Sequence, residues 1–296
     1  MRPAEQGFLL LTSHLGDPER KVLTVAQLRD LAGRAKDLDI TDPNRNMQIE
    51  DLVRLGYAPD MAQRILRLLD DKELLEYYLH RGARQGCQVL TRVSDGYPMQ
   101  VRAKLGLDSP GCLWAKGDIT LLGRPSVSAV GSRDLRKANR DFAREVGVQA
   151  AKQGYVLVSG NARGADTVAQ EACLAAGGCV ISVVADDLRD HKEQENVLCL
   201  SEDSFDMPFS SQRALSRNRV IHGLGIVTLV AQSGLNGGTW DGTVKNLKQN
   251  ISPVFCFADG SQAMQELCNL GATAVTACDL ADLSALKPNT PNFIDQ

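Results

Sequence analysis

Five apolar runs in the later two-thirds of the chain predict buried β-strands. They stay apolar throughout instead of alternating with polar residues, and they fall near residues 126–130, 155–159, 179–184, 226–230 and 252–257. Strands that are covered on both faces have this pattern, which is typical of parallel sheets flanked by helices. A last short strand is expected at the sheet edge, over residues 273–276. We therefore predict an α/β fold with a Rossmann-like, mostly parallel, doubly wound sheet.

The first third of the chain has a different periodicity, in which apolar residues recur at the three- and four-residue spacing of α-helices. Thr24 is expected to cap the first of these short helices, which form either a docking module or a cap on the main domain. The turn cluster Ser94–Pro98 marks the boundary. We expect a helical N-terminal module at residues 1–92, an extended Rossmann-like domain at 93–285 and a C-terminal tail at 286–296.

Two neighbouring strand-to-helix turns predict an anion-binding site. The first strand runs into the turn Gly131–Arg133, and the next runs into the turn Ser159–Gly164. In a parallel sheet both turns open at the carboxyl ends of the strands, where backbone N–H groups, a helix N-terminus and arginine side chains converge. This arrangement predicts a site for phosphate.

The segment between the two turns predicts a helix. Phe142, Val146 and Ala150 recur at i, i+4 and i+8, and Gly154 stands where a left-handed C-terminal cap is needed. Asp166 is expected to be the N-cap of the helix that follows the second turn.

Two arginines flank an amide in the segment Ser216–Arg219, and Ser216 is suited to cap a helix that begins there. Arg217 and Arg219 cannot both face the same way. We therefore expect one arginine to pair with the acidic segment 182–206, and we expect Arg217 to face the ligand.

A glycine-rich segment, Ser233–Thr239, follows the strand near 226–230. Its glycines allow the backbone to approach a ligand closely, and Thr239 offers a hydroxyl near a helix start expected at Asp241 or Thr243. Trp240 is the aromatic residue that we would place near a base, although an aromatic side chain at a helix start more commonly belongs to the core.

Charge is distributed unevenly along the 296 residues, whose formal net charge is −3. Residues 115–165 carry nine Lys/Arg against four Asp/Glu, and residues 182–213 carry three against eight. The net charge argues against a protein that binds nucleic acid over its whole surface, but the Lys/Arg residues of 115–165 can still make one face basic. The alternative is that these side chains form only the solvated surface of a helix. The expected DNA- or phosphate-binding residues are Gly131, Ser132, Arg133, Lys137, Ser159, Gly160, Arg163, Gly164, Arg217, Asn218, Ser233, Gly234, Gly237, Gly238 and Thr239.

The other chemistry-bearing residues predict neither a metal site nor an enzyme. The eight cysteines contain no C-x-x-C pair, and the four histidines show no metal-ligand spacing. No nucleophile–base pair stands out, although nucleotide hydrolysis is left open. No apolar run approaches the roughly 20 residues of a membrane span, and the N-terminal run is too short for a signal peptide. We expect a cytoplasmic protein with reduced thiols, no cofactor and no membrane association.

Several short motifs follow one another in a fixed order over roughly residues 95–285. They are Asp95–Pro98, Leu113–Gly117, Val130–Arg133, Ser159–Asp166, Ser216–Arg219, Ser233–Gly234 and Gly271–Ala272. As a set they resemble the DNA-processing protein A family (DprA/Smf). The resemblance implies an extended Rossmann-like domain that binds single-stranded DNA, forms a homodimer and loads a RecA-like recombinase during natural transformation.

The chain departs from that family's pattern in several places. Gln170 stands where the family commonly has a histidine, and no winged-helix module is expected after residue 285. The turn Gly237–Thr239 is more similar to the glycine-rich turn of the LOG phosphoribohydrolases, part of a wider LOG/SLOG nucleotide-binding group. That family's catalytic glutamate has no counterpart soon after the turn, where only Asp241 occurs, so hydrolysis is unsupported.

Three hypotheses follow for function. The first is a single-stranded DNA-binding, recombination-mediator-like protein that tracks the backbone with Arg133, Lys137, Arg163 and Arg217. The second is a Rossmann-like sensor or processing protein for a nucleotide or a nucleotide-derived signal. The third is an interaction scaffold whose N-terminal helices recruit a partner. In the first case affinity depends on phosphate contacts and falls with salt concentration.

Overall fold

The computed structural model describes residues 1–17, 19–38, 46–202 and 204–288. Within them one nine-stranded sheet forms the centre of the molecule, with the strand order β1-β2-β6-β5-β4-β3-β7-β8-β9. The strands are β1 (Cys87–Thr91), β2 (Cys112–Gly117), β3 (Ser126–Val130), β4 (Val156–Ser159), β5 (Cys179–Val184), β6 (Val197–Glu202), β7 (Thr228–Val230), β8 (Val254–Phe257) and β9 (Thr273–Val275). The seven strands from β6 to β9 in this order pair in parallel, and β1 and β2 extend the β6 edge antiparallel.

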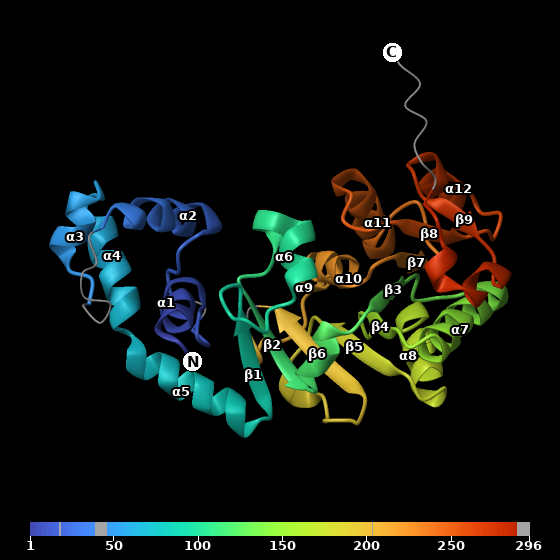
Figure 1. Ribbon diagram of the computed structural model, residues 1–296, viewed down its shortest axis with the longest axis horizontal. Helices are drawn as coiled ribbons and strands as arrows, with labels where there is room; N and C mark the ends of the chain where they lie inside the picture. The colour runs from blue at the N-terminus through green and yellow to red at the C-terminus, as the bar shows by residue number, and fades with distance from the viewer. Residues whose placement is uncertain (18, 39–45, 203, 289–296) are drawn as a thin grey trace, which may run out of the picture.

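The helices divide between the sheet and an N-terminal module (Figure 1). They are α1 (Pro3–Thr12), α2 (Val25–Arg34), α3 (Ile49–Arg54), α4 (Pro59–Asp70), α5 (Lys72–Arg84), α6 (Met99–Leu105), α7 (Lys137–Lys152), α8 (Ala165–Ala175), α9 (Ser211–Ser216), α10 (Asn218–Leu224), α11 (Gly238–Gln249) and α12 (Gln262–Asn269). Helices α1 to α5 lie beside the β1–β2 edge, and the other helices surround the rest of the sheet.

Alternate residues of the central strands enter two separate cores, as the period of two in a β-strand requires. Val127 and Leu157 pack against α7 and α8 on one face, where Phe142 is fully buried. Val156 and Val158 face the opposite core, which is covered by α6, α10 and α12. The α/β, doubly wound fold is thereby confirmed, because the sheet is mostly parallel and is covered on both faces.

The predicted strands all occur, and three further strands were not predicted. The expected edge strand at 273–276 is β9, at the end of the sheet. The chain to about residue 92 was expected to be helical, but Cys87–Thr91 forms β1, which pairs antiparallel with β2. Strand β6 lies within the acidic segment 182–206, and the charged residues on either side of its short apolar run kept it from being predicted as a strand. The end of the expected tail, residues 289–296, lies outside the described residues.

The structure confirms two of the predicted helix ends and corrects a third. Thr24 caps α2 with a capping box, its hydroxyl accepting from the Gln27 N–H. Phe142 and Ala150 lie on the buried face of α7, and Gly154 follows the helix with a φ of 77°. Asp166 is not an N-cap, because α8 begins one residue earlier, after Gly164, and Asp166 lies in the first turn.

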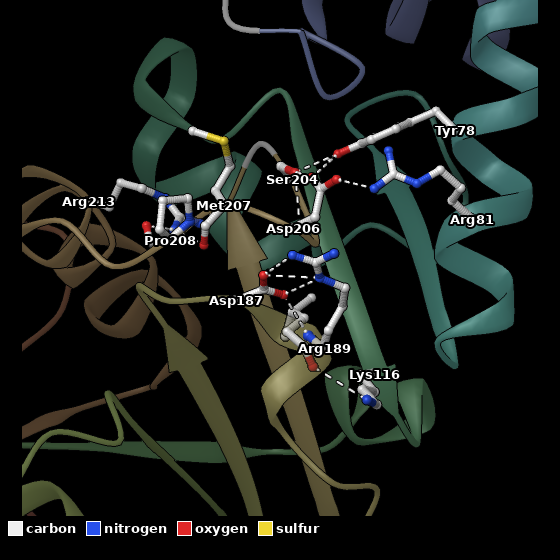
Figure 2. A network of polar contacts seen from close by, with 11 residues as sticks. Tyr78, Arg81, Lys116, Asp187, Arg189, Ser204, Asp206, Met207, Pro208 and Arg213 are labelled. Carbon is white, nitrogen blue, oxygen red and sulfur yellow. Dashed lines mark hydrogen bonds and ion pairs between the residues drawn. The ribbon is translucent and has the colours of Figure 1, made fainter.

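The N-terminal module packs against the sheet through aromatic side chains. Tyr78 of α5 makes an edge contact with Trp114 of β2, with ring centroids 5.4 Å apart, and Phe205 lies against both rings. Figure 2 shows Tyr78 and Arg81 reaching from α5 to Ser204 and Asp206, beyond the end of β6. The module is therefore joined to the sheet by a buried apolar cluster with a polar network at its border.

Candidate phosphate-binding cavity at the switch point of the sheet

A large cavity lies where the strand order changes direction, between β3 and β7. It has a volume of about 700 Å³ and includes Val130 and Gly131 at the end of β3 and Gly234 beyond β7. Ligands of open α/β sheets bind at such switch points, outside the carboxyl ends of the strands. Of the expected site residues, it is lined by Gly131, Ser132, Arg133, Arg217, Asn218, Gly234, Gly237, Gly238 and Thr239.

A smaller cavity of about 240 Å³ continues from the first one over the second turn. It is lined by Gly160 and Arg163 and shares Arg133 and Arg217 with the larger cavity. The two turns predicted from the sequence therefore open into adjoining cavities.

The two turns interlock, which explains two of their glycines. A Cβ at Gly131 would overlap Ala165, and a Cβ at Gly164, where φ is 96°, would overlap the carbonyl oxygens of Ser132 and Arg133. The Ala165 N–H donates to the Ser132 carbonyl oxygen at 3.2 Å. These glycines thus allow the turns to pack on each other, and Gly164 does not itself line either cavity.

Ser132 is hydrogen-bonded to the loop that follows β7. Its N–H and its hydroxyl both bond to the carbonyl oxygen of Gln232, at 2.9 and 3.2 Å. The Gln232 side chain bonds back to the Arg136 N–H and the Asp134 carbonyl oxygen. Ser132 was expected among the phosphate-binding residues, but its hydroxyl holds the β3 turn against the β7 loop.

Arg217 is the buried cation of the site. Its residue is 7% exposed, its Nη2 donates to the Gly160 carbonyl oxygen at 3.0 Å, and its Nε has no hydrogen-bond partner among the described residues. Burial lowers the pKa of Arg217, and Asp166 acts in the opposite direction from 3.8 Å away. Burial also raises the pKa of Asp166. Desolvation therefore outweighs the attraction between Arg217 and Asp166. A phosphate bound in the cavity would supply the negative charge that this buried guanidinium lacks.

Arg133 and Arg163 are the exposed cations of the site. Arg163 pairs with Asp134 at 2.7 Å, with both side chains largely exposed. Arg133 lines both cavities and forms no ion pair within the described part of the chain. A planar guanidinium presents several N–H donors in a fixed geometry and suits phosphate.

The glycine-rich loop ends at the N-terminus of α11, which faces the larger cavity. Gly237 is the N-cap with a φ of 90°, so the helix begins at Gly238 and not at Asp241 or Thr243. Asn218 donates to the Gly238 carbonyl oxygen at 3.1 Å and ties the loop to α10. The first N–H groups of a helix carry no intrahelical bond and attract anions.

Some predicted site residues lie away from the cavities. Ser159 is fully buried and donates to the Ala129 carbonyl oxygen, and Ser233 is buried and donates to the Gly234 carbonyl oxygen. Lys137 is exposed at the start of α7 and lines neither cavity. Trp240 packs against the main core and not at the cavity wall.

Arg219 confirms the expectation that one of the two arginines pairs with the acidic segment. Its guanidinium binds both carboxylate oxygens of Glu202, at 3.0 and 2.8 Å. The expectation for Ser216 was wrong, because Ser216 ends α9, whose N-cap is Ser210, and Arg217 precedes α10.

Exposed apolar side chains at the cavity rim were not predicted. Phe209, 57% exposed, lines the smaller cavity with Arg133 and Arg163, and Leu215, 50% exposed, lines the larger one. Exposed aromatic side chains beside cations are characteristic of nucleic-acid binding surfaces. The sequence signal that could have found Phe209 is an aromatic residue isolated in a polar loop just ahead of the arginine motif.

His222 lines the larger cavity but is built into the core. It is 2% exposed, its Nδ1 lies 3.1 Å from the Thr228 hydroxyl, and burial lowers its pKa to about 3. The imidazole is therefore neutral at physiological pH and adds no charge to the site.

The described residues offer neither a metal-binding cluster nor a membrane span. They contain no group of three or more His, Cys, Asp or Glu side chains suited to hold a metal ion. None of the helices in the described ranges combines the length and apolar character that crossing a bilayer requires.

The fold and the cavity define a Rossmann-like protein with an arginine-lined cavity at the switch point of its sheet. The chain belongs to the DNA recombination-mediator protein A family, whose model matches residues 88–284.

Curated relatives share part of this region. The DNA processing protein DprA of Bacillus subtilis is 29% identical over 167 residues, which are 52% of this chain and 55% of the relative. The protein Smf of Escherichia coli is 32% identical over 158 residues, which are 49% of this chain and 41% of the relative. The chain thus spans about half the length of the curated relatives it matches.

Two solved structures are similar in fold. DprA of Streptococcus pneumoniae superposes with a TM-score of 0.74 at 23% identity, covering 97% of this chain and 99% of that one. DprA of Helicobacter pylori, whose single-stranded DNA binding mode has been described, gives a TM-score of 0.56 at 25% identity, covering 66% of this chain and 94% of that one.

Proposed function

We propose that this protein binds single-stranded DNA and acts as a recombination mediator. The observation that carries the proposal is the set of three arginines, Arg133, Arg163 and Arg217, around two adjoining cavities at the carboxyl ends of β3 and β4. Membership of the recombination-mediator family supports it, as does the similarity to a relative that binds single-stranded DNA.

In this proposal the backbone phosphates contact the arginines and the N-terminus of α11. Arg133 and Arg163 contact phosphates on the exposed side of the cavities, and the buried Arg217 contacts one phosphate deeper inside. Phe209 stacks on a base at the rim, which contributes roughly 1–3 kcal/mol per stacked base. Phosphate contacts position a strand without reading its sequence, so binding is independent of base order.

The role is one of binding, not catalysis. We propose that the protein is cytoplasmic, that it forms a homodimer and that it delivers the strand to a RecA-like recombinase in DNA uptake or transformation. The helical module at residues 1–92 and the Rossmann-like region at 93–285 are then separate units of the same mediator, although β1 of the first unit pairs with β2 of the second.

A second candidate is binding of a single nucleotide or a nucleotide-derived signal. The volume of about 700 Å³ favours it, because small-molecule pockets measure roughly 300–1,000 Å³. The N-terminus of α11 would then hold the nucleotide phosphate.

Competition separates the two candidates. A labelled single-stranded oligonucleotide is bound to the protein and then challenged with mononucleotides and cyclic nucleotides. If the protein binds single strands, only unlabelled oligonucleotide displaces the labelled one. Phe209→Ala then weakens the affinity for the oligonucleotide by about 10-fold or more, the equivalent of one stacked base. Displacement by a mononucleotide at micromolar concentration, with Phe209→Ala unchanged, would reject strand binding as the main function.

A further inference from the structure

A second cavity of about 680 Å³ lies between the N-terminal module and the Rossmann-like region. One wall comes from α2 with Val25 and Arg29, and another comes from the segment 107–111. The remaining wall comes from α9, α10 and α11, including Lys245. We call this space the interdomain cleft.

The interdomain cleft adjoins the phosphate cavity directly. Leu215, Asn218 and His222 line both spaces. The exposed Leu215 at the end of α9 therefore stands on the border between them. A ligand that extends beyond the first cavity along α9 and α10 enters the cleft.

The charges of the cleft are mainly positive. Arg29 and Lys245 are exposed on opposite walls, and neither forms an ion pair with another described residue. Of the two acidic residues that line the cleft, Glu202 is held by both terminal nitrogens of Arg219, and Asp108 is exposed. The two exposed cations therefore outnumber the exposed carboxylate, and the cleft favours an anionic ligand.

The cleft also exposes apolar side chains that a folded protein normally buries. Val25 and Leu107 are 53% and 51% exposed, and Leu215 is 50% exposed. A cavity lined by both exposed apolar side chains and cations suits a ligand with flat apolar parts joined by negative charges, which describes the bases and phosphates of a single strand.

We propose that a single strand bound in the phosphate cavity continues over Leu215 into the interdomain cleft, where Arg29 and Lys245 hold further phosphates. This inference rests on the proposed function and adds a second, length-dependent subsite in which the N-terminal module contacts the DNA. Continuity with the first cavity and charge complementarity favour DNA over a peptide as the occupant.

The test compares two lengths of oligonucleotide on the whole protein. A short one of about 5 nucleotides and a long one of about 20 bracket the roughly 4–16 nucleotides covered by single-strand-binding folds. The double variant Arg29→Ala with Lys245→Ala should bind the short strand like the wild type and the long strand about 10-fold more weakly, with a salt slope smaller by about 0.7 for each phosphate that is no longer neutralised. The matched control, Arg54→Ala with Lys248→Ala, removes two exposed cations that line neither cavity and should change neither affinity.

Photocrosslinking tests direct contact. A photoreactive base near one end of the long strand should label residues 25–29 or 107–111, and the short strand should label neither segment. Unchanged affinity of the double variant for the long strand, or absence of those crosslinks, would overturn the inference while strand binding itself stands. If the wild type binds neither length, the proposed function fails, and a cleft that captures only acidic peptide would also contradict the inference.

Discussion

The guanidinium of Arg217 lies directly against the backbone of Gly160. Its Nη2 donates to the Gly160 carbonyl oxygen at 3.0 Å, and a Cβ at position 160 would overlap the guanidinium. The arginine comes from the junction of α9 and α10, whereas the glycine belongs to the turn after β4. This contact fixes the buried cation at the point where the two cavities meet.

Gly160→Ala should displace Arg217 and weaken the binding of single-stranded DNA by about 10-fold, the equivalent of one charge-assisted hydrogen bond. Overpacking should also lower the free energy of unfolding by about 1–3 kcal/mol. Fluorescence anisotropy and denaturant unfolding measure the two effects. The control is Gly123→Ala, where a Cβ meets no atom within 4 Å. Full affinity in the folded Gly160 variant would show that the position of Arg217 is immaterial to binding.

Neutralising Asp134 should strengthen binding. Asp134 pairs with Arg163 at 2.7 Å and faces the cavity, so it competes with phosphate for that guanidinium. In Asp134→Asn the freed arginine should steepen the salt slope by up to about 0.7 and raise affinity at low salt. The matched control is Asp141→Asn, which releases Arg144 on the surface of α7, away from both cavities. Equal affinity of the two variants would argue that Arg163 does not contact phosphate.

Tyr78→Phe should weaken the attachment of the N-terminal module. The Tyr78 hydroxyl donates to the Asp206 carboxylate at 2.6 Å and lies 2.5 Å from the Ser204 hydroxyl, in a buried setting. Because Tyr78→Phe removes one hydrogen-bond partner from both the Asp206 carboxylate and the Ser204 hydroxyl, it should lower the free energy of unfolding by roughly 1–3 kcal/mol. Tyr77→Phe, at a side chain that is 62% exposed, should leave thermal and denaturant unfolding unchanged. An unchanged free energy of unfolding in Tyr78→Phe would mean that these hydrogen bonds make no net contribution to stability.

His191 should make stability depend on pH on the alkaline side. Its Nε2 lies 2.9 Å from Asp186, and chiefly this hydrogen bond raises the pKa of His191 from 6.5 to about 10. Because the folded pKa lies above the unfolded one, the stabilisation is complete below pH 6.5 and is lost as the pH rises towards about 10.

The measurement is the free energy of unfolding across that range for the wild type and His191→Gln. The advantage of the wild type over the variant should shrink as the pH rises, and His80→Gln, at an exposed position of α5, serves as the control. If the difference in free energy of unfolding between the wild type and His191→Gln stays constant with pH, the pKa of His191 is not raised in the folded protein.

The central strands could be predicted because burial on both faces leaves long apolar runs, as in Cys179–Val184. Strand β1 was missed because its fold depends on pairing with β2, and a short edge strand after a helix carries little pattern of its own. The turns Gly131–Arg133 and Ser159–Gly164 could be placed at one edge of the sheet because parallel strands carry their carboxyl ends together.

The state of individual site residues could not be predicted, because it depends on contacts distant in sequence. Arg217 donates a hydrogen bond to Gly160, 57 residues earlier, and the Ser132 hydroxyl donates to Gln232, 100 residues later. Phe209 lies at the rim through the path of the loop before α9, which carries no periodic signal. Trp240, the aromatic side chain chosen from the sequence, packs against the core.

We propose that the arginine-lined cavity at the switch point binds the phosphates of single-stranded DNA. The most direct test is anisotropy of a labelled oligonucleotide with wild type and Arg133→Ala, titrated between about 50 mM and 200 mM salt, with Arg144→Ala as the control. We predict salt-sensitive binding by the wild type and the control, and for Arg133→Ala a weaker affinity with a slope smaller by about 0.7. A wild-type slope near zero, or equal binding by Arg133→Ala, would contradict the account.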